Sequence, residues 1–89
     1  MPTISAFFGI LIRMYHRDHG PPHIHAIYQG FEALIALEDG RLLQGKLPPK
    51  ALKLVQDWVA AHCGELAENW KRAEALLPLE QIPGADQDD

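Results

Sequence analysis

Apolar and polar residues alternate in four stretches of the first half of the chain. These stretches cover residues 7–16, 23–28, 32–38 and 41–44. A two-residue period places successive side chains on opposite faces, which is typical of β-strands. Gly9 inside the first stretch predicts a bulge or a close approach of the backbone. Asp39-Gly40 favours a tight hairpin turn because both residues tolerate a positive φ. We therefore predict a four-stranded antiparallel meander.

The period changes to that of a helix after residues 47–49, Leu-Pro-Pro, because proline fits the first turn of a helix and not its interior. The apolar positions that then share one helical face are Ala51, Val55, Trp58, Val59 and His62. Gly64 predicts a break, and Glu65 suits the start of a second helix that ends before Pro78. The predicted order is ββββαα, an α+β domain.

The 89 residues have the size of one domain. We expect residues 1–79 to form it and residues 80–89 to be a disordered acidic tail. The tail carries the whole formal charge of −4, because the eight basic groups of residues 1–79 are balanced by eight acidic ones. Nonspecific binding of nucleic acid needs many contacts between basic residues and phosphates. The net charge of this chain therefore does not indicate nucleic acid as a partner.

Cys63 is the single cysteine, which excludes an intrachain disulfide and fits a reducing compartment. No charged segment precedes the first apolar run, so we expect no signal peptide. The longest apolar run, residues 6–12, is too short to span a bilayer. We therefore expect a cytoplasmic protein with no membrane partner.

Residues 15–25, YHRDHGPPHIH, contain four of the five histidines. In the simplest hairpin register, His16 lies opposite His23 and Met14 lies opposite His25, and such cross-strand neighbours are about 5 Å apart at Cβ. The three histidines would then converge at one end of the sheet. A shift of the register by one residue would undo this convergence for one strand relative to the other.

These residue types fit three functions. A set of histidines and an aspartate suits a divalent transition metal, zinc above all, with candidate ligands His16, Asp18, His19, His23 and His25. Acid–base catalysis without a metal, such as RNA cleavage with Arg13 or Arg17 on the phosphate, gives the catalytic candidates Arg17, His19, His23 and His25. A recognition surface would bind through Tyr15, Arg17, Pro21, Pro22 and Tyr28. Alternatively, the histidines only hold the Pro-Pro turn by hydrogen bonds to its backbone.

Both faces of the first two predicted strands are apolar. Two helices cover one face of such a sheet, so the other face needs a cover of its own. We therefore expect a homodimer or a small protein partner.

The segments 1–10, 18–25 and 38–58, taken together, resemble a known family. Their order and spacing are similar to those of the small bacterial family catalogued as domain of unknown function 4160, over roughly residues 1–77. The family's hallmark is the Asp-His…Pro-Pro-His-x-His stretch, present here as Asp18, His19, Pro21, Pro22, His23 and His25.

The resemblance implies no established activity. It implies a place in small two-gene modules beside another short protein and, by analogy, a toxin–antitoxin-like role, with the small partner encoded nearby. We therefore expect a protein-binding or regulatory component of such a module. The alternative is a histidine-dependent nuclease or a metal-dependent hydrolase, so enzymatic activity stays open at this point.

Overall fold

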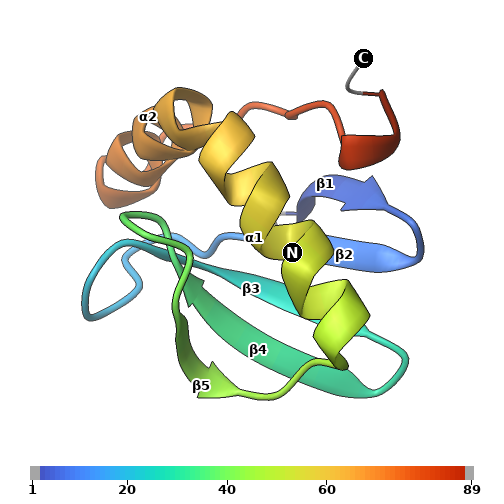
Figure 1. Ribbon diagram of the computed structural model, residues 1–89. Coiled ribbons are helices and arrows are strands. Elements are labelled where there is room, and N and C mark those ends of the chain that lie inside the picture. The colour runs from blue at the N-terminus through green and yellow to red at the C-terminus, as the bar shows by residue number, and fades with distance from the viewer. Residues whose placement is uncertain (1–2, 88–89) are drawn as a thin grey trace.

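The computed structural model describes residues 3–87 and contains a five-stranded antiparallel sheet followed by two helices (Figure 1). Each strand pairs with the next, in the order β1 (Thr3–Phe7), β2 (Ile10–Arg13), β3 (His23–Tyr28), β4 (Phe31–Ala36) and β5 (Leu42–Gly45). The helices are α1 (Pro49–Ala61) and α2 (Cys63–Glu74), and a short 3₁₀ turn, η1 (Ala85–Gln87), follows. The predicted α+β class is confirmed, but the prediction of four strands is wrong.

The additional strand arises because the predicted strand over residues 7–16 is two strands. Phe8 and Gly9 have φ values of 52° and 78°, and Phe7 pairs with Ile10 across this turn. Two consecutive positive φ angles are the mark of a tight two-residue hairpin turn. Gly9 therefore marks a turn and not a bulge. Phe7 is the only residue of β1 that lay in the predicted strand, and residues 3–6 were left unassigned by the alternation pattern.

The two helices cover one face of the sheet (Figure 1). The sheet side chains that face them are 0–1% exposed and comprise Ile10, Ile12, Ile24, Ala26, Ala33 and Ile35. Val55, Trp58 and Leu66 of the helices complete this core. The opposite face carries Leu11, which is 36% exposed, and the half-buried Ile27 and Leu34. Within the described chain, the core therefore lies on one side of the sheet only.

The register of β2 and β3 differs from the predicted one by one residue. Arg13, and not Met14, lies opposite His25. The reason is that β2 ends at Arg13, and the following loop, residues 14–22, is tied to the end of α2. The N–H of Arg17 donates to the carbonyl of Ala73 at 3.3 Å, and Nε2 of His16 donates to that of Leu77 at 3.0 Å. His23 and His25 consequently lie on the same face of the sheet as Arg13, opposite to the face of the core residues of β2.

The helices begin and break close to the predicted positions. Pro49 occupies the first turn of α1, and α1 and α2 meet at His62, where φ is −119° and ψ is 26°. The predicted break at Gly64 lies two residues later, inside the first turn of α2. Among residues 3–87, neither helix has the length and apolar character needed to cross a membrane.

The segment after α2 returns across the domain. Ile82 is 5% exposed, and its N–H donates to the carbonyl of Ile4 at 2.8 Å. Nε1 of Trp58 donates to the carbonyl of Pro83, and the buried amide of Asn69 forms two hydrogen bonds with the backbone of Glu80. The predicted tail therefore starts with a segment that packs on the core. Its last residues, Asp88 and Asp89, lie outside the described range.

Two glycine substitutions test this architecture. Gly45 has a φ of 84°, and a Cβ there would collide with the carbonyl oxygen of Glu32. We expect Gly45→Ala to lower the free energy of unfolding by about 2 kcal/mol or more, because the left-handed conformation and the collision both penalise alanine. Gly64 of α2 has open space around it, so Gly64→Ala should raise the same quantity by about 0.5–1 kcal/mol.

Urea denaturation of the two variants beside the wild type measures both effects. Equal stabilities of Gly45→Ala and the wild type would contradict the pairing of β4 with β5.

Candidate functional site

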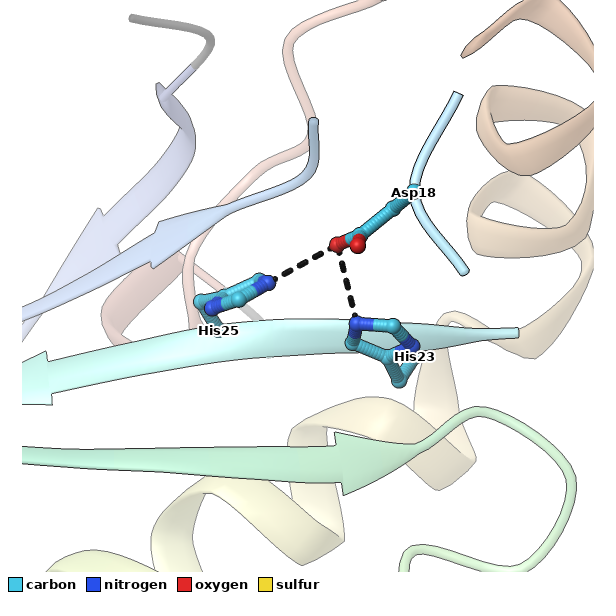
Figure 2. Close-up of side chains that lie close together, drawn as sticks. All are labelled: Asp18, His23 and His25. Atoms are coloured by element: carbon cyan, nitrogen blue, oxygen red, sulfur yellow. Dashed lines mark hydrogen bonds and ion pairs between the residues drawn. The ribbon is translucent and has the colours of Figure 1, made fainter. Parts of the chain in front are cut away.

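Asp18, His23 and His25 come together where β3 begins (Figure 2). Oδ2 of Asp18 lies 2.9 Å from Nε2 of His23 and 3.0 Å from Nε2 of His25. The two histidines are two residues apart on one strand, so their side chains point to the same side. Asp18 approaches them from the loop of residues 14–22. We call these three residues the Asp–His cluster.

Local structure fixes the position of Asp18. Arg17 has a φ of 55°, which turns the loop, and its N–H is bound to the C-terminal turn of α2. The other oxygen of Asp18, Oδ1, accepts the N–H of His19 at 2.9 Å. The aspartate is thus oriented by its own loop, and Oδ2 is left to face β3.

Each histidine of the cluster has its other ring nitrogen against a second acceptor. Nδ1 of His23 lies 2.8 Å from the carbonyl of Pro21, and Nδ1 of His25 lies 3.2 Å from Oε2 of Glu32 on β4. A carbonyl or a carboxylate oxygen can only accept, so each Nδ1 donates to its acceptor in the tautomer that carries the hydrogen on Nδ1. A neutral imidazole has a single N–H, and each Nε2 would then present a lone pair to Asp18.

In this tautomer, a cation at the centre of the cluster would satisfy all three atoms. Two lone pairs and a carboxylate oxygen repel one another unless positive charge lies among them. That charge is either a second proton on each imidazole or a metal ion bound by all three atoms. The ligand atoms of the cluster all lie within 4.8 Å of one another, which is close enough for one ion.

The pKa of Asp18 reflects the same surroundings. Partial burial is the largest influence and raises the pKa of this carboxyl. The hydrogen bonds from His25 and from the N–H of His19, with the charges of His23 and His25, outweigh it. The net result is a pKa below the ordinary value of 3.8, so Asp18 is ionised at neutral pH.

Aromatic rings enclose the cluster on two sides. His23 is 3% exposed, and its ring centre lies 5.4 Å from that of Trp70 in α2. The ring of Tyr15 meets that of His25 edge to face at 4.6 Å. The side chains of His25 and Asp18 keep exposures of 14% and 24%. Solvent therefore reaches the cluster from the side of His25 and Asp18.

A cavity of about 520 Å³ lies beside the cluster, and its lining includes Pro22, Leu37 and Trp70. Asp18, His23 and His25 are not part of that lining. The cavity and the cluster are therefore neighbours that share the Trp70 side chain as a wall, and the chemistry of the cluster does not open into the cavity.

The remaining predicted site residues lie outside the cluster. His16 is bound to the carbonyl of Leu77, and the ring of His19 is exposed. Arg17, Pro21 and Pro22 are exposed on the loop, with Pro21 contributing its carbonyl to His23. Tyr28 lies at the far end of β3, where its ring is near Gly9.

Two residues of the site were missed by sequence reasoning. Glu32 holds Nδ1 of His25, and Trp70 packs on His23. The sequence contains only a weak indication that Glu32 belongs to the site, because it is an acidic residue on the predicted third strand, next to the strand that carries the histidines. Trp70 had none, because its helical spacing predicts a core residue, and it is indeed 7% exposed in the core.

The lowered pKa of Asp18 gives a pH-dependent stability. Its folded-state pKa lies below its unfolded value, so its contribution is full above about 3.9 and is lost as the pH falls through the folded-state pKa. In metal-free protein we expect Asp18→Asn to reduce the free energy of unfolding by about 1–2 kcal/mol near neutral pH. The difference from the wild type should shrink below the ordinary pKa of 3.8.

Urea denaturation across this pH range, with a chelator present, makes the measurement. Asp57→Asn is the matched control, because Asp57 is exposed and pairs only with Lys53, so its effect should stay below about 0.5 kcal/mol. A difference between Asp18→Asn and the wild type that does not change with pH would contradict the interpretation.

Comparison with known proteins identifies the family. A family model described as a domain of unknown function, DUF4160, matches residues 9–71. This range holds β2 to β5, α1, most of α2 and the whole Asp–His cluster. Searches of curated proteins and of solved structures find no match. Because the family model covers well over half of the chain, the protein belongs to the DUF4160 family.

Proposed function

We propose that this protein binds a divalent transition metal ion, zinc above all, through Asp18, His23 and His25, and that its activity is metal-dependent hydrolysis. The observation that carries the proposal is the arrangement of the four ring nitrogens. Both Nδ1 atoms are committed to acceptors, while both Nε2 atoms face the same oxygen of Asp18. A metal ion resolves this meeting of three acceptors without any other change of partners.

The distances fit such an ion. Ligand atoms about 2.0–2.1 Å from a tetrahedral zinc lie roughly 3.3–3.4 Å from one another. The Nε2 atoms of His23 and His25 are 2.9 and 3.0 Å from Oδ2 of Asp18, so these two distances would open by a few tenths of an ångström around such an ion. All ligand atoms of the cluster lie within 4.8 Å of one another. The outer contacts fit as well, because histidine ligands usually donate their second N–H to a carbonyl or a carboxylate. Pro21 and Glu32 supply one of each.

Hydrolysis is favoured over a purely structural metal by the number of protein ligands. Structural zinc sites have four, and catalytic sites have three with one position open. The cluster offers three within the described residues, and its Asp18 side is open to solvent. A metal ion in such a site supplies Lewis acidity to a water molecule or a substrate.

Metal uptake tests the proposal. We expect the purified wild type to take up about one zinc per chain, and His25→Ala and Asp18→Asn to weaken the affinity by more than about 100-fold, which exceeds the effect of losing an outer contact. Elemental mass spectrometry and competition with a chromophoric chelator give stoichiometry and affinity. His19→Ala is the matched control, because its exposed ring lies outside the cluster, and it should bind like the wild type.

Circular dichroism establishes that each variant is folded. Glu32→Ala should weaken binding by about 10–100-fold, because His25 loses its outer acceptor. Glu38→Ala removes an exposed carboxylate elsewhere and should change nothing. A wild type that takes up no zinc, manganese, nickel or iron at micromolar concentration would rule the metal site out.

Protein binding, as a regulatory component of a two-gene, toxin–antitoxin-like module, is the second candidate function. The observation that favours it is the uncovered face of the sheet, where Leu11 is 36% exposed and Ile27 and Leu34 are half-buried. A second copy of the chain is the simplest occupant, because an isologous dimer pairs such a face with itself. The cluster and this face would then serve one assembly.

Sedimentation analysis tests the dimer. We expect the wild type to sediment as a dimer and Leu11→Glu as a monomer, because the carboxylate would be buried against the apolar face of the second copy. Phe8→Glu alters another exposed apolar side chain, 55% exposed and located at the β1–β2 turn, and should leave the dimer intact. A monomeric wild type would contradict the homodimer, and co-purification with the product of a neighbouring gene would then test the small partner.

A further inference from the structure

Arg13 stands directly beside the Asp–His cluster. It is opposite His25 in the pairing of β2 with β3, a relation that brings side chains of one face to about 5 Å at Cβ. The residue is half-buried, and its Nε atom is fully buried. That atom has no hydrogen-bond partner among the described residues.

An unpaired buried guanidinium N–H is unfavourable, because a buried donor without an acceptor costs about 1–3 kcal/mol. Neither Asp18 nor Glu32 relieves it, because neither is hydrogen-bonded to Arg13: Asp18 lies against Nε2 of His23 and of His25, and Glu32 lies against Nδ1 of His25. Among the described residues, Arg13 therefore has no acceptor for its buried Nε and no carboxylate partner for its charge.

The other arginines make the contrast clear. Arg41 is paired with Asp39 at 2.9 Å, and Arg72 is paired with Glu80 at 3.3 Å. Arg17 differs from Arg13 in being exposed, but it also forms no ion pair within residues 3–87, and it precedes Asp18 in the loop. Nε of Arg72 is also buried without a hydrogen-bond partner, so this atom alone does not set Arg13 apart. The difference lies in the ion pairs: Arg41 and Arg72 have carboxylate partners, whereas Arg13 and Arg17 have none within residues 3–87.

We propose that Arg13, assisted by Arg17, binds the phosphoryl group of a phosphate monoester at the metal site. This inference rests on the proposed function, since the metal ion would bind the same group. A guanidinium offers two parallel N–H donors that match two oxygens of a phosphate, a geometry that favours arginine over lysine.

The charge of the filled site selects a dianion. A divalent ion and the two guanidinium groups contribute four positive charges, and Asp18 and Glu32 contribute two negative ones, with both imidazoles neutral. The net charge of +2 is neutralised by a phosphate monoester, which carries about −1.5 to −2 at neutral pH. A carboxylate or a phosphate diester, with a single negative charge, would neutralise only half of it.

Calorimetric titration of inorganic phosphate into the zinc-loaded, dialysed protein tests the inference. The zinc content of each variant is measured first, so that loss of the metal and loss of phosphate binding are separate results. We expect the wild type to bind phosphate, and Arg13→Gln to keep its zinc while its phosphate affinity falls by about tenfold or more. Arg41→Gln is the matched control and should bind like the wild type, because Arg41 is already paired with Asp39.

Further variants and ligands cover the remaining outcomes. Arg13→Lys keeps the charge and loses the paired donors, so it should fall between the wild type and Arg13→Gln. If Arg13→Gln fails to fold, the exposed Arg17→Gln carries the test and should weaken phosphate binding with zinc retained. Equal phosphate affinity in all zinc-loaded arginine variants, acetate binding as tight as phosphate, or equally tight binding to metal-free protein would overturn the inference. A wild type without zinc uptake would refute the proposed function, and the inference with it.

Discussion

The rest of the site depends on one oxygen atom, Oδ2 of Asp18, which two imidazoles face at once. This contact joins the loop of residues 14–22 to β3, and the outer acceptors extend it to the loop backbone at Pro21 and to β4 at Glu32. All of these partners are acceptors, and a neutral imidazole has one N–H, so each ring satisfies both of its acceptors only when positive charge is added. A second proton on each imidazole supplies that charge, and a metal ion bound by the three residues would also supply it, with the outer hydrogen bonds kept in both cases.

The helical layer holds this oxygen in place, although the histidines belong to the sheet. Ala73 in the last turn of α2 accepts a hydrogen bond from Arg17, Leu77 just after the helix accepts one from His16, and Trp70 of α2 packs on His23. The loop is thus fixed between a helix and a strand that are far apart in the sequence. A disturbance of α2 should therefore reach the cluster through the loop, without any direct contact between α2 and Asp18.

The protein belongs to a family defined over residues 9–71, and that range contains the cluster together with Arg13, Glu32 and Trp70. The metal site and the uncovered face of the sheet are compatible proposals, because they use different groups. The cluster uses charged and ring nitrogen atoms at the start of β3, whereas the face presents Leu11, Ile27 and Leu34. Arg13 lies between the two, because it is on the same face of β2 as Leu11 and is paired with His25 of β3.

The sequence by itself determined the features that depend on neighbours along the chain. The two-residue period gave most of the strands, Asp39-Gly40 and Pro49 marked a turn and a helix start, and the spacing of His23 and His25 put both on one side of a strand. Local steric preferences decide these features, so they can be read from a few adjacent residues.

Only the tertiary structure decided which side chains meet. The register of β2 against β3 follows from where the loop binds α2, through contacts such as that of His16 with Leu77, which are 61 positions apart. Similar long-range packing brings Asp18, and not His16, to the two histidines of β3. It also places Glu32 against His25 and Ile82 in the core. A one-residue change of register exchanges the faces of a strand, and no local pattern fixes it when both faces are apolar.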